Sequence, residues 1–178
     1  MSKHIAFLRA INVGGHNVKM DALRQIFESL ELTHVETFIA SGNVIFEVKT
    51  ASIKALEKNI EVKLREELGY EVATFIRTVP ELAEIAKYRS FSQAKLDASA
   101  ALNIGFLAEL LDEKSIQRLM AMKTDIDDFH FHGREIYWLC QIKQSDSKVS
   151  NAVIEKTIGV KCTLRGVNTV IKMAERFC

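Results

Sequence analysis

The chain has 178 residues, of which 48% are hydrophobic and 26% are charged, and its 24 basic side chains nearly balance 23 acidic ones. Such a composition is typical of a globular protein and argues against a disordered chain or a membrane protein, while a net charge of +1 neither indicates nor excludes binding to nucleic acid. Three cysteines without Cys-x-x-Cys spacing, and no recognisable signal peptide, favour a cytoplasmic protein without disulfides, metal or a membrane partner.

The first half of the chain predicts the order strand, helix, strand, strand, helix, strand. Short apolar runs indicate the strands, and apolar residues spaced three or four apart indicate the helices. Ser41-Gly42-Asn43 separates two β-rich runs as a hairpin turn, and Gly69 ends the second helix. The expected elements cover residues 5–8, 20–30, 35–40, 44–48, 53–68 and 72–76.

A capping-box pattern, Thr78-Val79-Pro80-Glu81, then predicts the start of another helix. Residues 89–99 belong to a serine-rich, aperiodic stretch that we interpret as a linker. The second half repeats the order of the first, with a strand over 102–107, a helix around 116–120, a hairpin around Gly133, a helix ending at Gly159, a strand over 162–164 and a final helix from about Asn168.

The two halves are in step, which indicates an internal duplication. Hairpin turns fall at Gly42 and Gly133, the second helices end at Gly69 and Gly159, and the fourth strands close on Arg77 and Arg165. We therefore predict an α+β protein of two tandem ferredoxin-like (βαββαβ) halves, over residues 1–88 and 100–178, joined by the linker 89–99. The halves would also be able to pack as one compact domain.

Several motifs resemble a known family. They are the run Phe7–Gly15, the hairpin Ser41–Phe46, the stretch Ser147–Asn151 and the late Asn168–Val170. Together, and in this order, they resemble the family called domain of unknown function 1697, whose fold agrees with the duplication and whose name implies no activity. Ala10 stands where that family usually has Gly, and Gly166-Val167 stands where it usually has Asn-Trp.

The segment from Asn12 to Lys19 is the best candidate for a binding site, because it leads from a strand through two glycines into a helix. Backbone amides of such a turn and of a helix N-terminus are able to hold an anion together. In the predicted topology the hairpin at 41–43 lies at the same edge of the sheet. The predicted anion-binding residues are therefore Arg9, Asn12, Gly14, Gly15, Lys19, Ser41 and Asn43.

A purely structural interpretation of these residues stays open. The glycine pair would then serve a tight turn with positive φ, and Ser41 and Asn43 would supply turn chemistry. The segment lacks both the nucleotide-binding patterns Gly-x-x-x-x-Gly-Lys-Ser/Thr and Gly-x-Gly-x-x-Gly. Two alternating histidines, His130 and His132, lack an assured third metal ligand, and an exposed polar strand face explains them more simply.

These observations give three hypotheses for function. The first is a non-catalytic module that binds an anionic, phosphate-bearing small molecule at the glycine loop. The alternative is a protein–protein interaction or homodimeric scaffold protein, because no catalytic signature is recognised and no catalytic residue or cofactor is predicted. The third is an enzyme that acts on a phosphorylated substrate, and we leave open whether the protein is a monomer or a homodimer.

Overall fold

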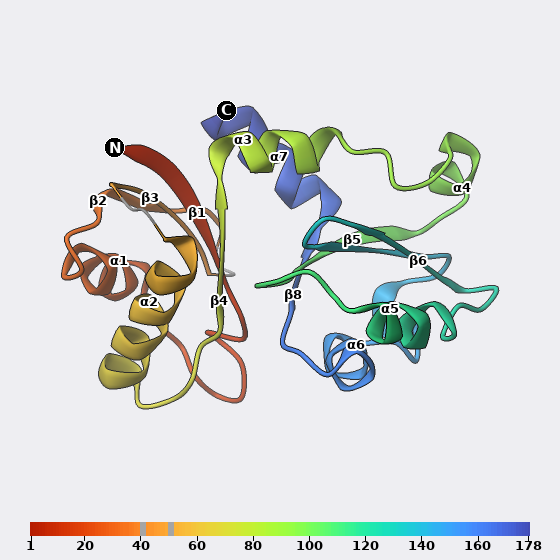
Figure 1. The fold of residues 1–178 in the computed structure, drawn as a ribbon, viewed down its shortest axis with the longest axis horizontal. Helices are drawn as coiled ribbons and strands as arrows, with labels where there is room; N and C mark the ends of the chain where they lie inside the picture. The colour runs from red at the N-terminus through yellow and green to blue at the C-terminus, as the bar shows by residue number, and fades with distance from the viewer. Residues whose placement is uncertain (40–41, 50–51) are drawn as a thin grey trace. The chain divides into compact units, whose positions relative to one another are not determined.

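A computed structural model describes residues 1–39, 42–49 and 52–178 (Figure 1). The chain forms two compact units, unit 1 with residues Met1–Ala83 and Phe177–Cys178, and unit 2 with residues Glu84–Arg176. The predicted α+β fold in two halves is confirmed. None of the helices in the described ranges combines the length and the apolar character of a membrane span.

Unit 1 contains an antiparallel sheet with the strand order β2-β3-β1-β4. Helices α1 and α2 cover one face of this sheet, and their apolar residues pack with Phe46 and Ile76 of the strands (Figure 1). The elements of the unit are β1 (Ser2–Leu8), α1 (Met20–Glu28), β2 (Thr33–Thr37), β3 (Asn43–Val48), α2 (Ile53–Leu68) and β4 (Thr74–Thr78).

Helix α3 (Val79–Lys87) follows β4 directly and carries the chain from unit 1 into unit 2. Unit 2 repeats the topology of unit 1, with the strand order β6-β7-β5-β8. Its elements are α4 (Gln93–Asp97), β5 (Ala101–Phe106), α5 (Glu113–Met120), β6 (Asp127–His132), β7 (Glu135–Cys140), a 3-10 turn η1 (Gln144–Asp146), α6 (Asn151–Ile158), β8 (Thr163–Gly166) and α7 (Val167–Phe177).

The core of unit 2 is built around the fully buried Trp138 on β7. Its indole N–H donates to Asp127 Oδ1 at 2.8 Å, and the Ser147 hydroxyl contacts the same carboxylate. A buried polar group with a partner costs little, so this pair fixes Trp138 without leaving a donor unsatisfied. Cys140 and Cys162 are both fully buried as free thiols.

Helices α2 and α6 end at the glycines that the sequence predicted as their C-terminal caps. Gly69 and Gly159 end α2 and α6 with φ of 82° and 78°, the left-handed conformation that glycine adopts without strain. The segment 89–99 differs from the expected linker because it contains the short helix α4, whose N-cap Ser92 accepts a hydrogen bond from the Lys95 N–H. A five-residue helix is too short to show an apolar period in the sequence.

Most α-helices in the described ranges have a side-chain cap at the N-terminus. Side chains cap the amides of α2, α3, α4, α5 and α6, through Ser52, Thr78, Ser92, Asp112 and Ser150 respectively. In the described part of the chain, α1 and α7 begin without a side-chain cap. An uncapped helix N-terminus leaves backbone donors that water or a ligand must satisfy.

Candidate functional site

The site begins where β1 ends. The Arg9 N–H donates to Ala73 O at 2.9 Å, which holds the backbone of Arg9 beside the segment that leads into β4. The next residue, Ala10, has a φ of 55°. This left-handed conformation is strained for any residue with a Cβ, and its strain explains why glycine suits this position.

Two hydrogen bonds close the loop that follows. The side-chain oxygen of Asn12 accepts the Val18 N–H at 2.8 Å, and Val13 O accepts the His16 N–H at 3.4 Å. Gly14 and Gly15 are the central residues of the second turn, with φ of 70° and 86°, and two positive φ values in a row are those of a type I′ turn. The predicted structural role of the glycine pair is thus present.

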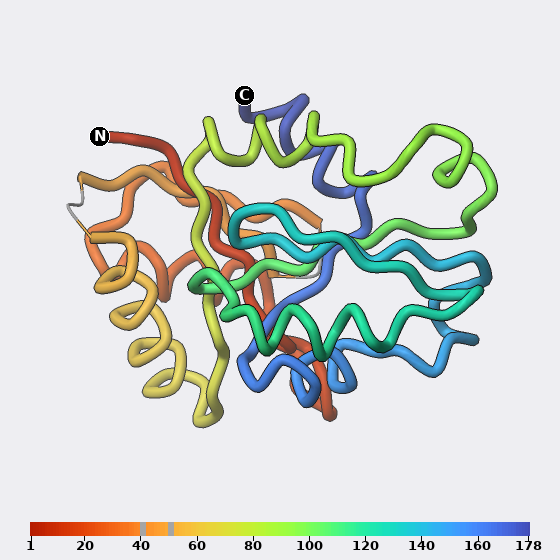
Figure 2. Tube along the Cα trace, turned by 45° about the vertical axis from the view of Figure 1, so that its right-hand side comes forward, coloured from red at the N-terminus to blue at the C-terminus, as the bar shows by residue number. Residues whose placement is uncertain are grey.

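The tip of this loop is open to solvent. A Cβ added at Gly14 or at Gly15 would have no other atom within 4 Å beyond the adjacent residues. The glycines therefore serve the backbone conformation and not close packing, and the peptide groups of the turn stay accessible. Figure 2 shows the loop extending past the end of its sheet before the chain enters α1.

Tyr70 anchors the base of the loop. Its hydroxyl donates to Ile11 O at 2.7 Å, and its ring stacks on the His16 ring with centroids 3.8 Å apart. Burial raises the pKa of Tyr70, so the hydroxyl keeps its proton and remains a donor at neutral pH. No short motif signals this contact, because Tyr70 lies far along the chain from Ile11, beyond the end of α2.

Lys19 stands at the N-cap of α1. It has an extended backbone (φ −66°, ψ 142°), its carbonyl accepts the Leu23 N–H, and its exposed side chain does not cap the helix. The first turn of α1 also carries Asp21, which is paired with Arg24. An exposed ammonium group therefore lies beside an uncapped helix N-terminus, where the helix dipole favours negative charge.

The hairpin reaches the same edge of the sheet as the end of β1. Gly42 O accepts the Leu8 N–H at 2.9 Å, and a Cβ added at Gly42 would come within 2.8 Å of Ile11 Cγ2. The contacts of Gly42 are thus with the base of the loop, whereas Gly14 and Gly15 have open space around them. Asn43 is fully buried and its amide donates to Phe38 O, while Ser41 lies outside the described residues.

The two histidines of unit 2 lie on an aromatic cluster. His130 Nε2 is 2.8 Å from the Tyr88 hydroxyl, and the Tyr88 ring stacks on His132 with centroids 3.9 Å apart. Burial lowers the pKa of His130, and the neighbouring His132 lowers it further. Among the described residues no three His, Cys, Asp or Glu side chains converge on one point.

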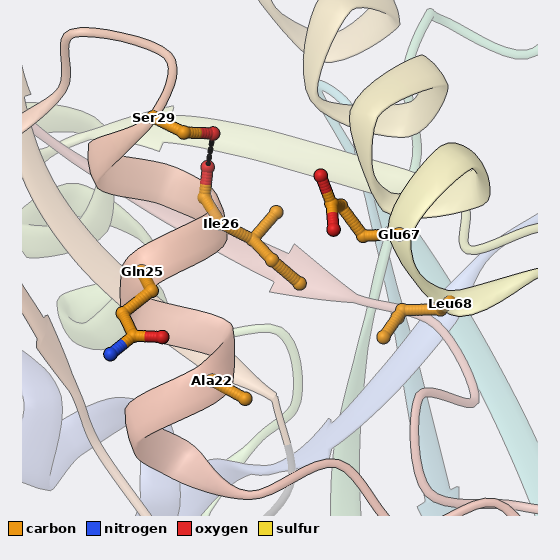
Figure 3. A pocket seen from close by; sticks show the side chains of 6 residues that line it. All are labelled: Ala22, Gln25, Ile26, Ser29, Glu67 and Leu68. Atoms are coloured by element: carbon orange, nitrogen blue, oxygen red, sulfur yellow. Dashed lines mark hydrogen bonds between the residues drawn. The ribbon is translucent and has the colours of Figure 1, made fainter.

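A shallow pocket of about 270 Å³ lies between α1 and α2 (Figure 3). Ile26 and Leu68 supply its apolar wall, and the Ser29 hydroxyl beside it donates to Ile26 O at 2.7 Å. Glu67, on the α2 side, is 2.7 Å from the Lys63 ammonium. None of the residues expected at the anion site lines this pocket.

Comparison with known proteins places the chain among uncharacterised relatives. A family model described as "Protein of unknown function (DUF1697)" matches residues 1–137. The solved structure of the conserved bacterial protein SP0830 from Streptococcus pneumoniae superposes with a TM-score of 0.76 at 24% identity, over 99% of this chain and 98% of that chain. That likeness concerns the fold alone. No protein of curated function matches.

Proposed function

The chain belongs to the DUF1697 family of proteins of unknown function, and, because membership brings no activity with it, we propose from the geometry that it is a non-catalytic binding module for an anionic ligand. The ligand lies at the uncapped start of α1, where the open glycine turn and Lys19 meet. We include in this proposal a cytoplasmic location, which is supported by an odd number of cysteines without Cys-x-x-Cys spacing. We also include two duplicated ferredoxin-like halves, which are supported by the common strand order of the two units.

The absence of a side-chain cap on α1 is the observation that carries the proposal. Five of the helices in the described ranges have a side-chain acceptor at their N-terminus, but α1 has Lys19 at that place, which donates and cannot accept. The Asn12–Val18 hydrogen bond joins the two ends of the loop one residue before Lys19. An anion at this point would receive the first amides of α1 and the charge of Lys19 together.

The site residues divide by role. Lys19 and the amides of Gly14, Gly15 and the first turn of α1 contact the anion, with Arg9 as a second cation at the end of β1. Asn12 and Asn43 act by shaping the loop and the hairpin, because hydrogen bonds to the backbone already engage their side chains. A phosphate group suits this set, because it offers several acceptor oxygens and a charge that two cations balance.

The test is a thermal-shift titration of the purified protein with inorganic phosphate and with ADP. A ligand that binds only the folded state stabilises it by about 2.7 kcal/mol at 100 times its dissociation constant. We expect Lys19→Gln to weaken binding at least tenfold. Lys58→Gln is the matched control, since it removes the same charge from an exposed position on α2. Equal shifts of the melting temperature for the wild type and Lys19→Gln would contradict the site assignment.

A specific observation also favours the alternative of a protein–protein interaction or homodimeric module. Val13 and Ile39, in the loops that follow β1 and β2, are 63% and 51% exposed. Exposed apolar side chains near one sheet edge suit a partner surface. If light scattering gave a dimer that Val13→Ser together with Ile39→Ser converted to monomer, and no phosphate compound shifted the melting temperature, this alternative would replace the first.

A further inference from the structure

The fourth strands of the two units, β4 and β8, each lie at an edge of their sheet. An edge strand has backbone N–H groups that point away from the sheet, and these groups pair with another chain unless the protein covers them. In unit 1, three outward amides of β4 each donate to a glutamate carboxylate of the same unit. The pairs are Thr74 with Glu61 at 2.9 Å, Ile76 with Glu57 at 2.7 Å, and Thr78 with Glu81 at 2.8 Å.

Strand β8 has the same place in unit 2, but in the described part of the chain a carboxylate covers only the first outward amide at this edge. Glu155 Oε1 accepts the Cys162 N–H at 2.9 Å. Outward amides recur at every second residue of a strand, so the next two are those of Leu164 and Gly166. Neither of these amides donates to another group in the described ranges. Leu164 is half-buried and Gly166 is exposed, so this edge is open to a partner.

Two side chains explain why the edge of β8 is less covered. On α6, Asn151 lies one helical turn before the glutamate, where α2 has a second glutamate. Its Nδ2 donates to Cys162 O at 3.1 Å, so it covers a carbonyl group and not the Leu164 amide. Three residues after Gly166 comes Thr169, where unit 1 has the glutamate of its capping box. Among the described residues, the outward amides of β8 thus have one carboxylate partner, and those of β4 have three.

The edge of β8 nevertheless keeps the cation that β4 has. Arg165 Nη1 donates to Leu164 O and to Thr163 Oγ1, both at 2.8 Å, as Arg77 Nη1 donates to Ile76 O at 2.8 Å in unit 1. Burial lowers the pKa of Arg165 to about 10, which leaves the guanidinium charged at neutral pH. Compared with the edge of β4, the edge of β8 lacks two negative charges and has the same positive one. An acidic partner would restore the balance.

This charge disfavours a second copy of the chain as the partner. Antiparallel pairing of two β8 strands about Leu164 would put the two Arg165 side chains on one face, as diagonal neighbours about 7–8 Å apart. Like charges at neighbouring positions of a sheet destabilise the pairing, whereas opposite charges stabilise it. A strand with acidic side chains therefore suits this edge better than β8 itself.

We propose that the edge of β8 binds an extended segment of a protein partner in which apolar and acidic residues alternate. Main-chain carbonyl groups of the segment accept the N–H groups of Leu164 and Gly166, so the segment adds a strand beside β8. Its apolar side chains lie next to Leu164 and its acidic side chains lie next to Arg165, because neighbours on adjacent strands share a face. The interaction lies within unit 2 and does not depend on the anion site at α1.

Amide hydrogen exchange of the full chain, followed by NMR, tests this interaction with the peptide acetyl-Val-Glu-Val-Glu-Val-Glu-Val-amide. We expect the saturating peptide to slow exchange of the Leu164 and Gly166 amides at least tenfold. The Ile76 amide, which Glu57 already engages, should exchange equally with and without the peptide. The same peptide with glutamine in place of glutamate should bind at least tenfold more weakly.

Two substitutions supply the missing carboxylates of the β8 edge. Asn151→Glu and Thr169→Glu should each weaken peptide binding at least tenfold. Thr169→Glu should also raise the melting temperature, because a glutamate at this position completes a hydrogen bond from the Gly166 N–H. Asn59→Glu is the matched control, since it adds the same charge at an exposed position on α2, and should leave peptide binding unchanged.

Four outcomes would overturn the assignment of the β8 edge. The proposal is wrong if the peptide protects neither amide, if its glutamine form binds as tightly, or if Thr169→Glu binds the peptide like the wild type. It is also wrong if the Leu164 and Gly166 amides become protected as the protein concentration rises without peptide, because a second copy would then occupy the edge.

Discussion

Units 1 and 2 share the same order of elements and the same strand order, yet they leave different helices uncapped. In unit 1 the helix after the first strand, α1, lacks a cap and the helix after the fourth strand, α3, has a capping box. In unit 2 the arrangement is reversed, because Asp112 Oδ1 accepts the Ser115 N–H at the start of α5 whereas α7 is uncapped. The topology thus determines where the helices begin, and single side chains determine at which helix N-termini the backbone amides remain available to a ligand.

The hairpin glycines should show the largest difference between the units. Gly42→Ala places a Cβ at a φ of 76°, 2.8 Å from Ile11 Cγ2 and 3.1 Å from Leu8 Cβ. Left-handed strain and overpacking together should cost about 3 kcal/mol of unfolding free energy. Gly133→Ala has the strain, at a φ of 57°, but only Glu135 Oε2 nearby, so it should cost about 1 kcal/mol. Urea denaturation of both variants measures these costs, and equal losses would refute the close approach at Gly42.

Substitutions at the caps of α1 and α3 should change the unfolding free energy by an intermediate amount. Thr78→Ala removes the capping box of α3 and should lower the unfolding free energy by about 1 kcal/mol. Lys19→Ser supplies α1 with the acceptor that it lacks, and should raise the unfolding free energy by up to about 1 kcal/mol. The same variant should weaken phosphate binding. A Lys19→Ser protein that is less stable than the wild type would mean that the amides of α1 already have a partner.

Ala10 allows a test at a smaller scale. Its φ of 55° is strained, so Ala10→Gly relieves about 1–2 kcal/mol of conformational energy and loses about 0.5–1 kcal/mol through the more flexible unfolded chain. The expected net gain is a few tenths of a kcal/mol, measured by denaturant unfolding. By the register of β1 and β5, the corresponding residue of unit 2 is Glu109, whose φ is not positive. Glu109→Gly should therefore destabilise, and a gain there would contradict the explanation.

The smallest expected effect is a pH dependence confined to unit 2. Burial holds the pKa of His130 below its usual value of about 6.5. The unfolded chain therefore binds a proton at His130 at a higher pH than the folded chain does. Stability from this group is complete above the unfolded pKa and falls as the pH decreases through about 6.5. His130→Asn should reduce the slope of the urea unfolding midpoint against pH between 7.5 and 5.5. An unchanged slope would mean that other groups cause the pH dependence of stability.

Much of the fold was readable from the sequence because the signals are local. The capping box at Thr78 and Glu81, and the helix ends at Gly69 and Gly159, depend only on neighbouring residues. The edge shared by β1 and the hairpin followed from topology, and the Leu8–Gly42 hydrogen bond confirms that approach. Helix α4 was missed because five residues show no period.

The contacts that define the sites were less accessible. Asparagine is a common turn residue, and the sequence therefore suggested turn chemistry for Asn43. In the structure its amide is buried beneath the hairpin, which no local pattern predicts because burial depends on the whole sheet. Tyr70 meets Ile11 across 59 positions of sequence, and no short motif signals such a pairing.

The most direct test of anion binding at α1 is a backbone-amide NMR titration of the wild-type protein with inorganic phosphate. We expect saturable shifts of the Gly14, Gly15 and Asp21 amides, with one common dissociation constant. The amide of Ser115, which Asp112 already engages at the start of α5, should not move. If phosphate left the amides of the glycine turn and α1 in place, or shifted the capped start of α5 equally, α1 would have no anion site.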